Sequence, residues 1–372
     1  MCHNAAASPA RAAGRLCYTR RAVVLCDRTR TDPAPAAVLT LTLFVPGLIP
    51  ADEAHARVAA QPTLYRWLCR GRQEIVDAVD TDAALGAWFG LAGSEELPHA
   101  ALSALGSGID PRAAVWLHAD PVHLHAQRTE LVLVDAARLA IDGAESHALV
   151  EALNAHFSHD AIRLHALSPT CWIAESRTSA QLRTVPLSVA AGRNVDALLP
   201  AGTDALAWHR RSNEAQMLLH AHPVNQEREA RGAPALNSLW WWGVGALPVC
   251  TRAFDAVWGE DAFLRGLARR TDAPAHPLPA DATAWLREAR RGTHLVALRP
   301  PPSGDSTNVA ALEQAWFAPI ARALAQGRIV SATLATCAHG RRVAWRLTRA
   351  DRWKLWRRDP QLPRHTPRHV HA

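Results

Sequence analysis

Apolar runs of strand length alternate with segments of helical periodicity along this chain, and this alternation limits its fold to few classes. Residues 38–45 alternate threonine with large apolar residues and are followed by Pro46 and Gly47, which predicts a buried strand that ends in a turn. Further strand-like runs lie at 113–117, 131–134, 162–187, 239–242, 295–298 and 329–334, and helical spacing is found at 52–72, 83–91, 100–105, 144–157, 205–220 and 309–324. Strands that alternate with helices predict an α/β fold with a mostly parallel sheet.

The net charge of +7 over 372 residues is carried by the two ends of the chain. Residues 1–37 hold six arginines against two aspartates, and residues 340–372 hold nine arginines and Lys354 against two aspartates, which leaves the middle at −5. Lys354 is the only lysine among 41 basic residues, which indicates a compositional bias toward arginine. We expect residues 1–37 to be a disordered basic extension, 38–358 the folded domain and 359–372 a polar tail.

Seven cysteines are spread over the chain without a C-x-x-C pair, namely Cys2, Cys17, Cys26, Cys69, Cys171, Cys250 and Cys337. A disulfide framework or a zinc ribbon needs paired or closer spacing, so we expect free thiols in a reducing compartment. No apolar run reaches the roughly 20 residues of a membrane-spanning helix. These observations predict a cytoplasmic protein that has no membrane partner.

The densest group of polar residues suited to ligand binding lies between 213 and 245. Helical spacing carries His220 to a break at Pro223, and a second short helix precedes Gly232 and the apolar strand 239–242. Ligands bind at the carboxyl ends of strands in α/β sheets. The residues expected to converge on a small anion such as phosphate are His220, His222, Asn225, Arg228, Arg231 and Asn237. The alternative is a structural corner, because such side chains also cap helices and satisfy buried backbone groups.

This segment resembles the archaeal-type, cofactor-independent phosphoglycerate mutases of the alkaline phosphatase superfamily, which carry a similar H-P-V-N, R, G-x-P-x-N and W-x-W-G-x-G succession. From residue 38 onward the chain is more similar to the RpfE-type regulatory proteins, a bacterial branch of that family, with further matches at 61–71, 117–124 and 131–135. The resemblance implies an alkaline-phosphatase-like, mostly parallel sheet with flanking helices. It also implies a small inserted α+β subdomain at about 118–212.

Several positions that carry the chemistry of the mutases are changed in this chain. Where the mutases have a metal-binding Asp-Gly at a strand end, this chain has Val45, Pro46 and Gly47. Ser94 stands where the resemblance implies the nucleophilic serine, and the late metal-ligand pairs are reduced to Asp305 and His339. A two-metal site needs several carboxylates and imidazoles, so we expect a catalytically degenerate protein, a pseudoenzyme.

Other candidate residues have simpler interpretations. Ser94 is favoured as the N-cap of a helix over its role as a weak candidate nucleophile. His118, His123 and His125 could ligate a metal, because the last two share one face of an extended strand, but 19 histidines occur in this chain and scattered positions are favoured. The three tryptophans 240–242 predict a strand buried on both faces.

Three functions remain open. The favoured one is a regulatory or binding protein whose partner is a small anion or another protein. The second is a metal-dependent phosphomutase or phosphohydrolase with substituted ligands, and only this alternative calls for a divalent metal. The third is a nucleic-acid-associated regulator that uses the basic run 341–358, where Trp345, Trp353 and Trp356 are interleaved with arginines. For this run an edge strand, with tryptophans facing the core and arginines facing water, is favoured over nucleic-acid binding.

Overall fold

The computed structural model describes residues 38–49, 58–78, 80–93, 96–111, 115–128, 130–178, 180–298, 308–338, 340–360 and 362. All of them belong to one of the two units of the chain, residues 37–372. The basic extension 1–37, most of the tail 359–372, and the candidates Ser94, Asp305 and His339 lie outside the described residues.

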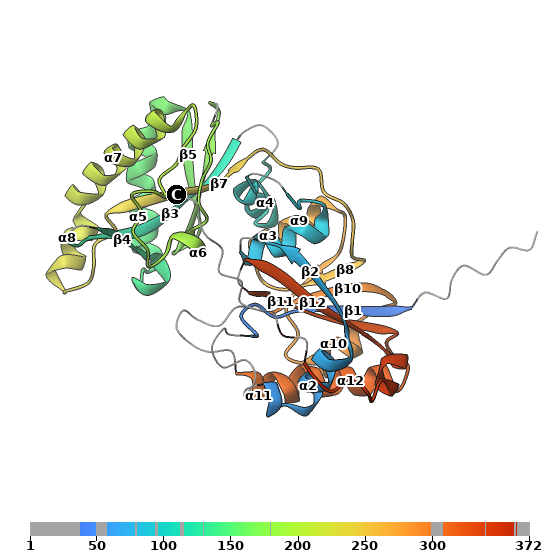
Figure 1. Cartoon of the computed structure of the whole chain (residues 1–372). Helices are drawn as coiled ribbons and strands as arrows, with labels where there is room; N and C mark the ends of the chain where they lie inside the picture. Colours follow the sequence, from blue (N-terminus) through green and yellow to red (C-terminus); the bar gives the residue numbers. More distant parts are fainter. Residues whose placement is uncertain are drawn as a thin grey trace, which may run out of the picture. The chain divides into compact units, whose positions relative to one another are not determined.

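A seven-stranded sheet forms the main part of the fold, in the order β2-β12-β11-β1-β10-β8-β9 (Figure 1). Its strands are β1 (Leu39–Phe44), β2 (Arg72–Asp77), β8 (Ala256–Trp258), β9 (Ala275–His276), β10 (Gly292–Ala297), β11 (Ser331–Ala338) and β12 (Arg341–Thr348). The five strands from β11 to β9 are parallel, and β12 and β2 are added antiparallel at one side. The predicted α/β fold with a mostly parallel sheet is therefore confirmed.

Helices cover both faces of this sheet. Strand β1 is apolar on both sides, as expected for a central parallel strand, and each side packs against helices. Leu41 and Leu43 pack in one core with α2 (Pro62–Arg70), α10 (Ala282–Glu288) and α12 (Ala318–Ala325). Phe44, which points to the other face, packs with α3 (Thr81–Gly86), α4 (His99–Gly106) and α9 (Ala262–Arg270). The predicted helix 309–324 is continuous through α11 (Val309–Leu312), a π-turn (Glu313–Phe317) and α12.

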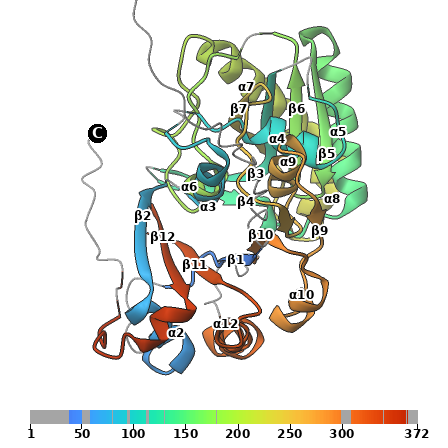
Figure 2. The same ribbon diagram turned by 90° about the vertical axis from the view of Figure 1, so that its right-hand side faces the viewer.

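A second sheet is entirely antiparallel and is built on the long strand β3 (Val115–Ala126). Its other strands are β4 (Leu131–Asp135), β5 (Ile162–Ser168), β6 (Cys171–Ser176) and β7 (Ser238–Gly245), with α5 (Gly143–His156), α6 (Leu187–Ala190), α7 (Ala205–Ala221) and α8 (Pro223–Ala230). Both β6 and β7 pair with β3 (Figure 2 shows this group in a second view). The inserted subdomain was expected at about 118–212, whereas the elements of this sheet extend to Gly245, because β7 returns to β3.

The prediction of an edge strand at 343–348 is wrong. Strand β12 lies inside the sheet, because β2 pairs with its outer side. Strand β2 is itself the edge, and its sequence is Arg-Gln-Glu-Ile-Val-Asp. Edge strands are often polar, so this strand lacks the alternating apolar pattern by which strands are predicted. Trp345 is buried as predicted, but Arg342 is buried too, with its guanidinium 4.3 Å from the ring centroid of Trp88.

Among the described residues no helix has the length and apolar character needed to span a membrane.

Candidate functional site

The carboxyl ends of β1, β10 and β11 meet at one edge of the main sheet, where α/β sheets bind ligands. The backbone N–H of Ala78, just beyond β2, donates to the carbonyl oxygen of Gly340, just beyond β11, so the chain after β2 lies at this edge. A cavity of about 400 Å³ opens there between the segment 77–97 and residues 184–189 and 242–243. Its polar lining includes Asp77, Asp80, Glu96 and Thr184, and no lysine, arginine or histidine occurs among the described residues that line it.

Four ionisable side chains form a continuous row beside this cavity, which we call the Asp-His-His-Asp row. Asp82 Oδ2 lies 3.3 Å from His99 Nε2, and His99 Nδ1 lies 2.8 Å from His118 Nε2. The other ring nitrogen of His118 lies 3.6 Å from Asp120 Oδ2. His99, His118 and Asp120 are buried, so their mutual contacts replace most contact with water.

Three strands of the second sheet hold one end of the row. His118 and Asp120 are two residues apart on β3, so their side chains leave the strand on the same face. Trp242 of β7 stacks on His118 with 4.2 Å between ring centroids and donates its indole N–H to Asp120 Oδ2 at 2.7 Å. The backbone N–H of Trp172 donates to the other carboxylate oxygen at 2.9 Å. Asp120 is thereby fixed by donors on two neighbouring strands.

A close helix pair holds the other end. His99 is the first residue of α4, which packs against α9 at very short range. A Cβ added to Gly266 of α9 would lie 1.9 Å from the carbonyl oxygen of Leu102, so only glycine permits this approach. Phe263 of α9 consequently stacks on the His99 ring with 4.2 Å between centroids.

The surroundings of the two histidines shift their pKa values in opposite directions. Burial lowers the pKa of His118 more than Asp120 raises it. Burial also acts to lower the pKa of His99, but the Asp82 carboxylate outweighs it and the pKa of His99 is raised. Burial acts to raise the pKa of Asp82, and His99 reverses this and lowers it. These directions favour the charged forms of Asp82 and His99 and the neutral form of His118.

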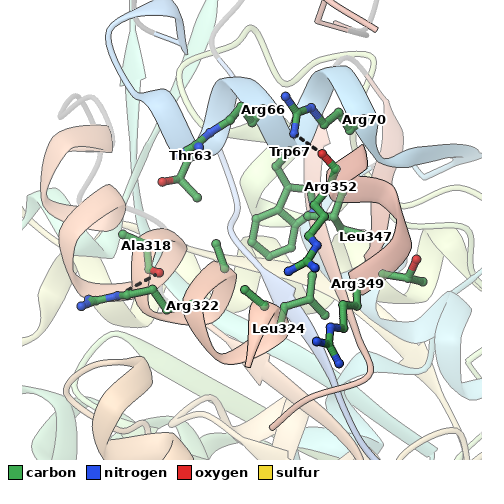
Figure 3. Close-up of a pocket in the computed structure, with 13 residues that line it drawn as sticks. Thr63, Arg66, Trp67, Arg70, Ala318, Arg322, Leu324, Leu347, Arg349 and Arg352 are labelled. Carbon is green, nitrogen blue, oxygen red and sulfur yellow. Dashed lines mark hydrogen bonds between the residues drawn. The ribbon is translucent and has the colours of Figure 1, made fainter. Parts of the chain in front are cut away.

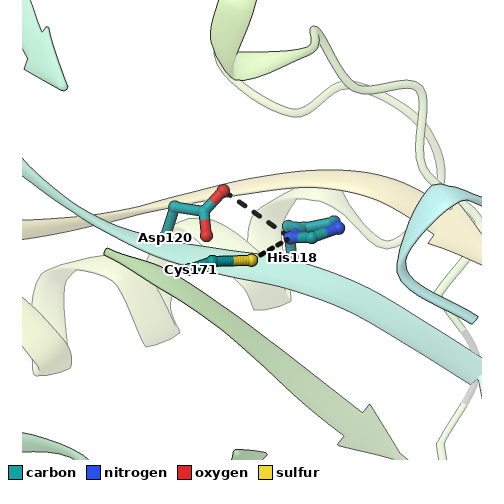
Figure 4. Close-up of side chains that lie close together, drawn as sticks. All are labelled: His118, Asp120 and Cys171. Carbon is teal, nitrogen blue, oxygen red and sulfur yellow. Dashed lines mark hydrogen bonds and ion pairs between the residues drawn. The ribbon is translucent and has the colours of Figure 1, made fainter. Parts of the chain in front are cut away.

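Cys171 adds a third ligand type next to His118 and Asp120. Its Sγ lies 3.9 Å from His118 Nδ1, and Figure 4 shows Asp120 approaching the same ring. Burial, followed by the Asp120 carboxylate, raises the pKa of the Cys171 thiol well above its ordinary value. The three ligand atoms lie within 4.8 Å of one another, whereas a tetrahedral zinc site would place them roughly 3.3–3.6 Å apart. To bind one zinc-like ion here, these atoms would have to move closer together and the Cys171 thiol would have to lose its proton, which its raised pKa opposes.

The described residues do not fit the two-metal site that the resemblance implies. Val45 and Pro46 at the end of β1 have no side chain that could bind a metal. Asp80 Oδ1 accepts the backbone N–H of Ala83, its Oδ2 accepts the Ser188 hydroxyl, and Asp82 pairs with His99. Beyond the group of Fig. 4, no set of three metal-ligand side chains comes together within the described part of the chain.

The six residues expected to bind an anion lie at the other end of β7 from the Asp-His-His-Asp row. Asn225 donates to the carbonyl oxygens of Leu219 and Leu236 at 2.8 and 2.9 Å and accepts the backbone N–H of Leu236 at 2.8 Å. Arg228 is fully buried; it donates to Glu145 at 2.7 Å and to two backbone carbonyl oxygens, one of them that of Pro234. These contacts join α8 to its neighbours.

The other four residues of this set differ in exposure. Asn237 bridges to both backbone groups of Leu124 on β3, and His222 caps α8 by accepting the backbone N–H of Val224. Arg231 is exposed and also pairs with Glu145, and His220 is exposed. Anion binding by the six residues stays a prediction, and the structure assigns four of them roles in the helix-turn-strand corner.

Other candidates take defined places. The tryptophans 240–242 are buried in β7, as predicted. His123 and His125 lie on one face of β3, and His123 Nδ1 contacts the carbonyl oxygen of Ala235 at 2.9 Å. His118 could be singled out in the sequence as a candidate ligand, but Asp82, His99, Asp120 and Cys171 could not be assigned to the same site. They come from four separate elements, and no spacing along the chain connects all of them.

Comparison with known proteins places this geometry in context. No protein-family model matches the chain. The chain is 30% identical over 122 residues to the 2,3-bisphosphoglycerate-independent phosphoglycerate mutase of Methanosarcina mazei, which covers 32% of this chain and 30% of that protein. It is 26% identical over 139 residues to the enzyme of the same name from Methanosarcina barkeri, with 34% of each chain covered. The matches therefore span about a third of the length of these curated relatives.

Two solved structures are similar over most of the chain. The PH0037 protein from Pyrococcus horikoshii is 15% identical, with a TM-score of 0.56, and the alignment covers 84% of this chain and 87% of that one. The cofactor-independent phosphoglycerate mutase from Thermoplasma acidophilum is 16% identical, with a TM-score of 0.49 and coverage of 88% and 96%. The chain thus shares the fold of the PH0037 protein, and over about a third of its length it has a distant homology to the cofactor-independent phosphoglycerate mutases.

Proposed function

We propose that this chain is a phosphoglycerate-mutase-like regulatory or binding protein, of the RpfE type, that does not catalyse phosphoryl transfer. The proposal rests on the residues that follow β1. There the first parallel strand brings Val45 and Pro46 to the sheet edge, where the resemblance to the mutases implies a metal-binding carboxylate. The substitution removes a ligand at a central position of the edge, between β10 and β11.

The cavity at the same edge supports this proposal. Its carboxylates are engaged by protein groups: Glu96 accepts both the backbone N–H and the hydroxyl of Thr184, and Asp77 pairs with Arg341. Burial raises the pKa of Glu96 despite these donors, which indicates poor solvation of its charge. A phosphate group entering this cavity would meet carboxylates, with no basic side chain among the described lining residues to offset them.

Turnover assays test the proposal directly. The purified full chain is incubated with 3-phosphoglycerate, and separately with p-nitrophenyl phosphate, in the presence of Mn²⁺, Mg²⁺ or Zn²⁺. An archaeal phosphoglycerate mutase is the positive control. We expect no turnover above the background without protein. Turnover that Ser94→Ala abolishes would overturn the proposal, because that serine would then act as the nucleophile.

A metal-dependent enzyme with substituted ligands is the second candidate, and the group His118, Asp120 and Cys171 is the observation that favours it. These three residues would hold one ion, which would supply Lewis-acid chemistry when bound. Metal analysis of the purified protein distinguishes the two proposals. A stoichiometric ion that is lost in Cys171→Ala supports the second, and protein free of metal after refolding with Zn²⁺ removes its basis.

A further inference from the structure

A second pocket lies at the opposite edge of the main sheet from the candidate site, at the amino end of β11. It has a volume of about 370 Å³ and is bordered by α2, α12, the end of β12 and the 3₁₀ turn Arg349–Trp353 (Figure 3). Ligand pockets in proteins have volumes of roughly 300–1,000 Å³. The pocket is therefore large enough for a small organic molecule.

Five arginines surround this pocket, and three segments far apart in the sequence contribute them. Two come from α2, one from α12 and two from the 3₁₀ turn, namely Arg66, Arg70, Arg322, Arg349 and Arg352. Within the described part of the chain none of the five forms an ion pair with a carboxylate. The nearby carboxylate of Asp351 is taken by Lys354 at 2.5 Å and by Thr348 at 2.6 Å.

The guanidinium groups keep most of their hydrogen-bonding capacity. Arg66 and Arg322 each donate one Nε–H to a backbone carbonyl oxygen four residues earlier, and Arg70 donates from Nη1 to the carbonyl oxygen of Arg352. The Nε of Arg70 is buried without a partner among the described residues. Each guanidinium has five N–H donors, so most donors around the pocket are available to a ligand. Arginine matches phosphate and carboxylate oxygens in bidentate geometry.

The interior of the pocket is apolar. Trp67 is 1% exposed and forms part of the wall, together with Leu324, Leu347 and the alanines of α12, and Figure 3 shows these side chains between the arginines. A bare inorganic anion would leave this apolar surface unused. A ligand with a ring or short chain would cover it while its acid groups reach the arginines.

We infer that this pocket binds a small organic anion that carries at least two negative charges and a planar aromatic ring, the chemistry of a nucleotide. Such a ligand neutralises a cluster of like charges that the described protein leaves without counter-charges, and it fills the apolar interior. The inference does not depend on the proposed function, because the pocket and the candidate site lie at opposite edges of the sheet.

Calorimetric titration of the full chain tests the inference with three probes at 50 mM and 300 mM NaCl. ADP carries both the charges and the ring, pyrophosphate carries only the charges, and adenosine carries only the ring and sugar. We expect ADP to bind most tightly, pyrophosphate at least tenfold more weakly, and adenosine below detection. The affinity for ADP should fall at the higher salt concentration, because the contacts are largely electrostatic.

A pair of matched variants locates the binding. Arg322→Gln combined with Arg349→Gln should weaken ADP binding at least tenfold, and both side chains are exposed, so the fold is retained. The control combines Arg193→Gln with Arg210→Gln, which removes the same charge from two exposed positions away from the pocket. The control should bind ADP as the natural chain does.

Three results would overturn the inference. The first is no ADP binding at millimolar concentration, and the second is an equal loss of affinity in the control. The third is a single-stranded oligonucleotide that binds more tightly than ADP and depends on Arg322 and Arg349, which would assign the arginines to a nucleic acid instead. Thermal unfolding of each variant confirms that it is folded, and ADP should raise the unfolding temperature of the natural chain but not that of the pocket variant.

Discussion

Replacing Arg228 with methionine separates the two interpretations of the segment 213–245. Arg228 is fully buried, and its Nη1 lies 2.7 Å from Glu145 Oε2. Arg231 pairs with the other oxygen of the same carboxylate, but its side chain is 52% exposed. The two arginines thus share one partner in different surroundings, which makes Arg231→Met a matched control.

The structure sets the expected size of each effect. Arg228→Met leaves the buried Glu145 with a single, partly exposed counter-charge and deprives two carbonyl oxygens of their donor. Breaking a buried pair on one side costs about 3–5 kcal/mol, and we expect a loss in this range in the free energy of unfolding. Arg231→Met removes an ion pair screened by solvent, for which about 0–1 kcal/mol is expected.

Urea unfolding followed by tryptophan fluorescence measures both variants, and phosphate binding is titrated in parallel. If the segment is a structural corner, Arg228→Met is much less stable and Arg231→Met is nearly unchanged in stability and in phosphate binding. The reasoning is refuted if the two variants lose the same stability. It is also refuted if Arg231→Met, while fully stable, abolishes a measurable affinity for phosphate, because the segment would then be an anion site.

Two further predictions concern the helix pair and the cavity. Gly266→Ala should destabilise the chain by about 3 kcal/mol or more, because the new Cβ would overlap the carbonyl oxygen of Leu102. The control Gly143→Ala places a Cβ where no atom lies within 4 Å, so it should be neutral or stabilising by up to about 1 kcal/mol. Thermal unfolding measures both variants, and equal effects would contradict the close approach of the two helices. Glu96→Gln should stabilise the chain at pH 8 relative to the natural chain and lose this advantage near pH 4. The pKa of Glu96 is raised by burial, so the folded state binds the proton more strongly and stability falls as pH rises from the ordinary pKa through the raised one. Unfolding free energies at both pH values test this, and an advantage that is the same at both would count against it.

The succession of elements could be predicted where local pattern and tertiary environment agree. The helix 144–157 was predicted from its apolar spacing and is observed as α5, with a capping box formed by Asp142 and Glu145. Strand β2 could not be predicted in this way. Its polar residues face water at the edge of the sheet, and it is a strand because β12 offers its backbone groups, which are distant in sequence.

The candidate site depends even more on contacts between residues that are distant in sequence. His118 could be singled out in the sequence, but its meaning depends on His99, which a separate helix brings to within 2.8 Å. The arginines around the second pocket likewise could not be grouped from the sequence. The charge distribution placed the basic character at the two ends, while Arg66, Arg70 and Arg322 come from the net acidic middle of the chain.

The sequence by itself determined the α/β class, the buried tryptophan strand and the absence of a metal-binding side chain at Val45 and Pro46 after β1, because periodicity and residue chemistry are local properties. Only the tertiary structure decided which charges are paired. Electrostatic interactions depend on distance and burial in space, and both change when segments distant in sequence pack together. The tertiary structure therefore places Arg228 inside a structural corner and leaves the five arginines around the second pocket without carboxylate partners among the described residues.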